Sequence, residues 1–162
     1  IRQMRLPYTV HVLRIVFRNA IAAAHSLPLI LLVFLFCGHL PGPEAALALP
    51  GLVLVATCAV AGAMLLGMLC ARFRDIPPIV TNVMQLAFFM SPVLWKPELL
   101  GEGQRWLVLN PFYVVMEVVR GPLVEGGAPA AIWAAAAFFT AVLLAVAGLF
   151  FVRFRARLAF WI

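Results

Sequence analysis

Long apolar stretches constrain this chain more than any other feature of its sequence. Four of them approach the roughly 20 residues that an α-helix needs to cross the hydrocarbon core of a bilayer. They cover about residues 20–40, 45–70, 76–95 and 131–152. Hydrophobic residues make up 65% of the chain and charged residues only 11%, too few charges to coat a soluble globule of 162 residues. The sequence therefore predicts an all-α, polytopic membrane protein, one bundle of four transmembrane helices over residues 1–162.

The basic residues predict how these spans are oriented. If the segment before the first span is cytoplasmic, the inner segments carry Arg2, Arg5, Arg14, Arg18, Arg72, Arg74, Arg153, Arg155 and Arg157. The outer segments carry only Lys96, Arg105 and Arg120. By the positive-inside rule, the segment 1–19 and the tail 153–162 are both predicted to lie in the cytoplasm.

Residues 1–19 are too polar to cross a membrane, but they are patterned. His11, Arg14, Arg18 and, further on, His25 share one side of a helix, and apolar residues fill much of the remainder. This pattern is typical of an amphipathic helix that lies along the membrane surface. Two interpretations stay open, a simple lipid anchor and a docking surface for a soluble partner.

The segment 96–130 is predicted to be an outer loop that contains one short helix, residues 111–120. Asn110 is a typical N-cap before a proline, and Gly121-Pro122 is a typical stop. Ten residues give about 15 Å of helix, half the thickness of the hydrocarbon core, so the helix is either interfacial or re-entrant. Tyr113, Glu117 and Arg120 share one face of it. The Glu–Arg pair is either an exposed surface pair or an intramembrane pair that faces water or a polar ligand.

The third span carries residues that a simple membrane anchor would avoid. Arg72, Arg74 and Asp75 precede it, and it contains Asn82, Gln85, Ser91 and Pro92. Each polar group in hydrocarbon needs an internal partner. This span is therefore predicted to pack against protein or to line a path, which favours transport. Asp75 is the expected N-cap of the span.

Small residues recur at nearly every fourth position on two of the spans. One series is Ala59, Ala63, Gly67 and Ala71, and the other is Ala134, Ala137, Ala141 and Ala145. Such series are typical of faces where helices pack closely, although an alanine-rich span also produces them by chance.

The motifs of several enzyme classes are absent from the sequence. It has no P-loop, no His-Glu-x-x-His and no nucleophile elbow, and its three cysteines lack metal-ligand spacing. Its basic residues do not form a nucleic-acid-binding pattern. We therefore predict a protein that is not an enzyme, with no metal or cofactor of its own and no nucleic-acid partner.

Three blocks of residues resemble a known family. Arg74-Asp75-Ile76, Ser91-Pro92-Val93-Leu94 and Leu109-Asn110-Pro111, with Arg120 about ten residues later, resemble the permease subunits of ABC exporters for cell-surface polysaccharides. These subunits export lipid-linked O-antigen, capsule or teichoic-acid chains. The resemblance covers essentially the whole chain. Members typically have six spans, so the four spans here suggest a chain that is truncated at its N-terminus.

The resemblance implies a location, partners and site residues. It implies a bacterial inner membrane protein in which two permease copies form the pore and separate ATPase subunits bind ATP and Mg²⁺. His11, Arg14 and Arg18 would lie on a helix that couples to the ATPase. Arg72, Arg74 and Asp75 would form the cytoplasmic entrance near the pyrophosphate of the lipid carrier. Asn82, Gln85, Ser91 and Pro92 would line the translocation path, and Tyr113, Glu117 and Arg120 would form an outer gate.

Two other functions stay open at this point. One is a permease of the same superfamily that exports a drug, haem or a small lipid. The other is a membrane-embedded glycosyl- or acyltransferase component, which would need clustered Asp, Glu or His at one membrane face. The predicted inner face has one acid, Asp75.

Overall fold

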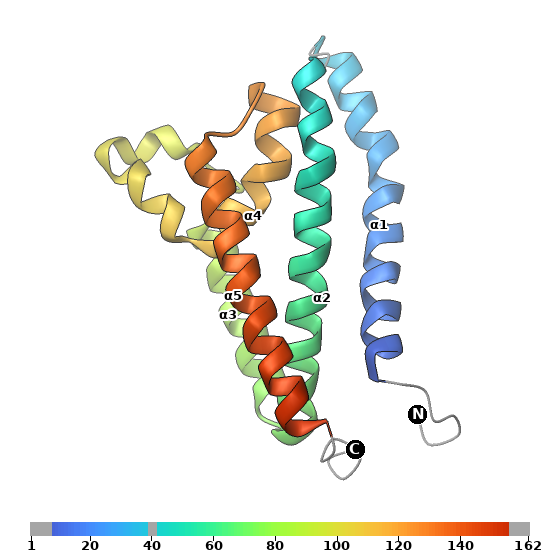
Figure 1. The fold of residues 1–162 in the computed structure, drawn as a ribbon. Coiled ribbons are helices and arrows are strands. Elements are labelled where there is room, and N and C mark those ends of the chain that lie inside the picture. The colour runs from blue at the N-terminus through green and yellow to red at the C-terminus, as the bar shows by residue number, and fades with distance from the viewer. Residues whose placement is uncertain (1–7, 39–41, 156–162) are drawn as a thin grey trace.

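A computed structural model describes residues 8–38 and 42–155, and its regular elements are all helical (Figure 1). In chain order they are α1 (Tyr8–Phe36), the 3₁₀ segment η1 (Pro43–Leu47), α2 (Ala48–Arg72), α3 (Ile76–Met90), the 3₁₀ segment η2 (Pro97–Leu109), α4 (Pro111–Arg120), the π-helical turn η3 (Gly121–Glu125) and α5 (Ala130–Phe154). Among the described residues, three helices are long and apolar enough to cross a membrane: Tyr8–Phe36, Pro43–Arg72 and Ala130–Phe154. A fourth span is counted if η2 and the segment Pro111–Glu125, bent by 103° to each other, are one broken span. The predicted helical membrane bundle is confirmed.

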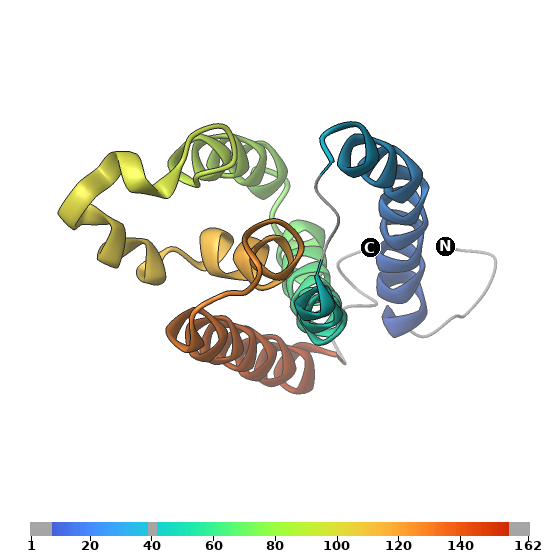
Figure 2. The same ribbon diagram turned by 90° about the horizontal axis from the view of Figure 1, so that it is seen from above.

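The helices are arranged around α2. Helix α1 lies on one side of α2 and α5 on the other, while α4 packs against both α2 and α5 (Figure 2). The turn between α2 and α3 lies at the same end as the last residues of α5, which is the predicted inner end (Figure 1). Segment η1 lies at the opposite, predicted outer end, in contact with η3 (Figure 1).

Helix α1 corrects the predicted boundary near residue 20. The described residues of the surface segment and those of the first span form one continuous helix, Tyr8–Phe36; residues 1–7 and 39–41 lie outside the described part. Polarity changes along this segment, but no glycine or proline occurs from Tyr8 to Leu27, so the backbone hydrogen bonds continue past residue 20. At 1.5 Å per residue, 29 residues span about 43 Å. A helix that crosses a core of about 30 Å then has about nine residues to spare.

The start of α1 is fixed to α2. The Tyr8 hydroxyl donates a hydrogen bond to the Met64 carbonyl (3.2 Å), and Val12 is buried. Successive residues of a helix are turned by about 100°, so Arg14, two positions after Val12, points away from α2. Both Arg14 and Arg18 are exposed.

Helix α3 is shorter than the predicted span 76–95. It ends at Met90 because Ser91 is extended (ψ 142°) and Pro92 has no N–H to continue the helix. Its 15 residues span about 22 Å, less than a hydrocarbon core. Asp75 does occupy the N-cap position, but its side chain accepts no capping hydrogen bond because its backbone is already helical (ψ −12°).

The predicted outer loop is largely helical. Segment η2 consists of two stretches of 3₁₀ turns that meet at Gly101, whose φ of +51° suits a residue without Cβ. Helix α4 has the predicted bounds, Pro111–Arg120. The α-helix ends at the predicted stop, Gly121. The backbone nevertheless continues as the π-helical turn η3 and leaves the helical conformation only at Gly126, which is left-handed (φ 75°).

The small-residue series mark the packed faces only in part. On α5 the buried residues are Ile132, Ala136, Thr140 and Ala147, whereas Ala134, Ala137, Ala141 and Ala145 are exposed. On α2 the buried residues are Ala48, Gly51, Ala61 and Met68, and Ala59 is exposed. Gly67 of the series, however, lies against the Tyr8 side chain of α1. An alanine-rich helix is smooth on several sides, so contacts with the larger neighbouring side chains decide which side packs.

Candidate functional site

The break after α3 frees backbone groups that other segments then satisfy. A helix leaves its last carbonyl groups without donors from the helix itself. The indole nitrogen of Trp95 donates to the Phe89 carbonyl (3.2 Å), and Asn110 Nδ2 reaches the Met90 carbonyl (3.5 Å). Arg120 Nη1 donates to the Pro92 carbonyl (3.3 Å). Side chains from later in the chain therefore hold the end of α3 in place.

Asn110 joins this break to the start of α4. Its Oδ1 accepts hydrogen bonds from the Phe112 and Tyr113 amides (3.0 and 3.4 Å), which makes it the N-cap of α4. Its Nδ2 also donates to Ser91 Oγ (3.2 Å), and Ser91 is only 3% exposed. One side chain thus starts α4 and attaches it to α3. We name Ser91, Pro92, Asn110, Glu117 and Arg120 the α3–α4 junction.

Replacing Asn110 by alanine is expected to destabilise the protein by about 1–2 kcal/mol, because the cap and the link to Ser91 are lost together. Ser91→Ala removes only one hydrogen bond and is expected to have about half that effect. Asn19→Ala, at an exposed position of α1, serves as the control and is expected to change nothing. The measurement is the free energy of unfolding in mixed micelles. Equal values for Asn110→Ala and Asn19→Ala would contradict the assigned role.

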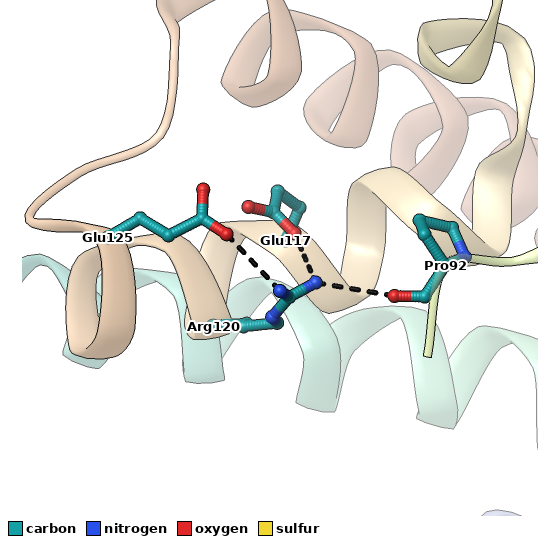
Figure 3. Close-up of polar contacts among 4 residues, drawn as sticks. All are labelled: Pro92, Glu117, Arg120 and Glu125. Carbon is teal, nitrogen blue, oxygen red and sulfur yellow. Dashed lines mark hydrogen bonds and ion pairs between the residues drawn. The ribbon is translucent and has the colours of Figure 1, made fainter. Parts of the chain in front are cut away.

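Electrostatics at the far end of α4 depend on Arg120 (Figure 3). Its Nη1 lies 3.7 Å from Glu117 Oε2, and its Nη2 lies 3.2 Å from Glu125 Oε1. The Glu117 side chain is 3% exposed, and its Oε2 accepts no hydrogen bond from a described residue. The Glu–Arg pair at i,i+3 is therefore not a surface pair. Arg120 is the cation beside a buried carboxylate, and it also binds the backbone after α3.

Gly121 lets the chain turn close to this carboxylate. A Cβ at Gly121 would lie 2.9 Å from the Gly127 carbonyl oxygen and 3.3 Å from Glu117 Oε1. The close approach of η3 to its own continuation thus requires glycine here. The buried Glu117 side chain therefore lies directly beside the tight η3 turn.

The remaining predicted site residues lie elsewhere. At the predicted inner end, Arg72, Arg74 and Asp75 are exposed around the turn between α2 and α3, and Arg72 lies over the Phe73 ring (5.3 Å to the centroid). On α1, His11 is half-buried while Arg14 and Arg18 are exposed. Asn82 and Gln85 are exposed on α3, whereas Ser91 and Pro92 are buried in the junction. The structure thus separates the four predicted path residues into two pairs.

Three contributors to this region were not predicted as site residues. Trp95 and Glu125 had no predicted site role, and Asn110 was predicted only as a cap. A helix-ending Ser-Pro followed by a tryptophan is a usable signal, because the freed carbonyl groups need donors. No local pattern indicates that Asn110 reaches residues 19 and 20 positions earlier.

An apolar cavity of about 870 Å³ lies among α1, α2, α4 and α5. Its lining includes Ile30, Leu52, Val115 and Val146, with Arg120 among the few polar contributors. Through Arg120, the α3–α4 junction therefore borders a cavity that is suited to a hydrocarbon chain.

The fold and the site together define the class of protein, a multi-pass helical membrane protein. In this protein, side chains of the bent pair, η2 with Pro111–Glu125, and of the loop before it form hydrogen bonds with the end of the short apolar helix α3. Residues 2–124 match the family described as ABC-2 type transporter. This match covers more than half of the chain, so the protein belongs to the ABC-2 type transporter family. It is the membrane component of an ABC transporter, which implies an ATPase partner subunit. No curated protein and no solved structure matches the chain.

Proposed function

We propose that the chain is a permease subunit of an exporter for lipid-linked polysaccharide in the bacterial inner membrane. Two copies form the pore, and the ATPase partner binds ATP and Mg²⁺ and drives the pore between closed and open states. The chain itself transports and does not catalyse. Its C-terminus is cytoplasmic in this proposal.

The observation that carries the proposal is the meeting of sequence blocks at the α3–α4 junction. The residues on which the polysaccharide-permease resemblance rests include Ser91-Pro92, Asn110-Pro111 and Arg120, and hydrogen bonds connect all three positions. That these residues are far apart in sequence and yet bonded to one another supports the proposal that they act as one unit. The apolar cavity beside Arg120 supports a substrate with a hydrocarbon part.

We assign each proposed role to one part of the molecule: the inner end, the translocation path or the outer end. Arg14 and Arg18, with His11, receive the movement of the ATPase at the inner end of α1, where the helix is longer than the bilayer requires. Arg72, Arg74 and Asp75 form the entrance for the charged head of the carrier, because guanidinium groups bind phosphate strongly. Asn82 and Gln85 line the path, together with the Ser91-Pro92 break. Tyr113, Glu117 and Arg120 form the outer gate.

Charge reversal on α1 tests the ATPase contact. The double variant Arg14→Glu, Arg18→Glu is expected to reduce co-purification of the ATPase by roughly tenfold or more, because both positions point away from α2 and the like charges then repel the partner. Arg153→Glu is the control: it changes an exposed arginine near the last residues of α5, at the same end. Co-purification unchanged by the double variant, or reduced equally by Arg153→Glu, would rule out the assignment.

Transport by the reconstituted permease and ATPase tests the substrate. Proteoliposomes are supplied with an undecaprenyl-pyrophosphate-linked oligosaccharide, with haem or with a fluorescent drug. ATP-dependent movement of the oligosaccharide alone supports the proposal. Movement of haem or the drug instead favours the small-molecule alternative, and glycosyl or acyl transfer without ATP favours the transferase alternative.

A further inference from the structure

A second cavity, at the predicted outer end, has a mixed polar and apolar lining. Its volume is about 410 Å³, within the range of about 300–1,000 Å³ that is common for small-molecule sites. It lies between η2, the start of α4 and the start of α5. Glu102, Gln104 and Arg105 line one part, Tyr113 another, and Pro129 and Ile132 form an apolar wall.

Tyr113 is the buried polar residue of this lining. It is 6% exposed, and its hydroxyl makes no hydrogen bond within the described ranges 8–38 and 42–155. The hydroxyl itself keeps some exposure, because the fully buried side-chain atoms without a hydrogen-bond partner in the described part are Glu117 Oε2 and Thr140 Oγ1. It lines the cavity without a partner among the described residues. The other tyrosine of the chain, Tyr8, does have one, the Met64 carbonyl. The Tyr113 hydroxyl can therefore bind a ligand in the cavity without giving up an internal contact.

The charges of the lining select the kind of ligand. Arg105 is its cation, and Glu102 lies 4.0 Å from it, so the two charges balance. An anionic ligand would find no uncompensated positive charge here. A metal ion is also disfavoured, because no group of three or more His, Cys, Asp or Glu side chains in the described part could hold one.

A neutral ligand rich in hydroxyl groups fits this combination. Carboxylate and amide oxygens accept hydrogen bonds from hydroxyl groups, while guanidinium and amide N–H groups donate to them. The wall of Pro129 and Ile132 suits the C–H face of a sugar ring. We propose that this cavity binds one neutral sugar ring, with the Tyr113 hydroxyl as a hydrogen-bonding partner. Only the source of the ring, the exported glycan, rests on the proposed function.

Binding is tested on the full chain in lipid nanodiscs, without the ATPase. Saturation-transfer NMR is recorded with methyl glucoside and with N-acetylglucosamine as probes. Tyr113→Phe keeps the ring and removes only the hydroxyl, so unfolding should be unchanged while sugar affinity falls by about three- to tenfold. Tyr8→Phe, at the opposite end, is the matched control and should bind as the wild type does. Gln104→Ala should also weaken binding, and glucose 6-phosphate should bind more weakly than methyl glucoside.

Three results would overturn the inference: no saturation transfer from either neutral sugar, equal affinity in Tyr113→Phe and wild type, or tighter binding of glucose 6-phosphate. Each of these can occur while ATPase co-purification and glycan transport succeed, in which case the proposed function stands and the sugar site does not. Conversely, sugar binding that depends on Tyr113 in a protein that transports no glycan would keep the site and reject the proposed source of its ligand.

Discussion

Replacing Arg120 by methionine is expected to destabilise the protein by about 3 kcal/mol or more, because it leaves the buried carboxylate of Glu117 without its cation. The loss includes the hydrogen bond to the Pro92 carbonyl and the ion pair with Glu125. Surroundings of low polarity increase the effect, since little water is present to solvate the remaining charge. The measurement is the free energy of unfolding in mixed micelles.

The chain contains a matched control for this variant. Arg105 also has a glutamate three positions earlier, but its side chain is 72% exposed and that of Glu102 is 95% exposed. Arg105→Met is therefore expected to leave stability unchanged. The double variant Glu117→Gln, Arg120→Met removes both charges and should recover a large part of the loss. Equal effects of Arg120→Met and Arg105→Met would show that the buried pair contributes nothing.

Gly51→Ala is expected to have the second-largest effect, a loss of about 2–3 kcal/mol. A Cβ at this position would overlap the carbonyl oxygen of Val118, at the contact between α2 and α4. The obstacle is backbone, so no side-chain rotation relieves it, and α4 has to move away from α2. Val118 is fully buried, so this movement also opens the core beside the α3–α4 junction.

Gly62→Ala provides the control on the same helix. Its Cβ would lie 3.9 Å from Leu143 Cδ2, an ordinary van der Waals distance. Alanine favours a helix over glycine by about 0.5–1 kcal/mol, so this variant should be neutral or stabilising. Thermal unfolding of the two variants should move in opposite directions. A Gly51→Ala protein as stable as Gly62→Ala would mean that α2 and α4 are not in close contact.

Local signals predicted α4 well. Its start depends on Asn110 and Pro111, which are neighbours in sequence, and its bounds agree with the prediction. The pairing of Glu117 with Arg120 is local as well, since the two lie one turn apart. Whether that pair is exposed could not be predicted from α4 alone. The residues around it come from η3 and from Pro92, which lie outside this helix.

Other features could not be read from neighbouring residues. Ser91-Pro92 was predicted to line a path, and no neighbouring residue indicated that Ser91 also accepts a hydrogen bond from Asn110, 19 positions away. The prediction for α1 was wrong for a different reason. A change of polarity near residue 20 suggested a helix boundary, but the backbone is helical without a break there. Hydropathy reports where a helix prefers to lie, whereas hydrogen bonding decides where it ends.

The sequence by itself determined the class of protein, the approximate positions of its long helices and the limits of α4, because apolar length, capping residues and prolines act over a few neighbouring residues. Only the tertiary structure decided which helix faces are buried and that Arg120 bonds to Pro92, 28 positions earlier. The physical reason is the same for both: these contacts depend on how whole helices cross. That crossing is set by points of close backbone approach such as Gly51 against Val118, which no local pattern reveals.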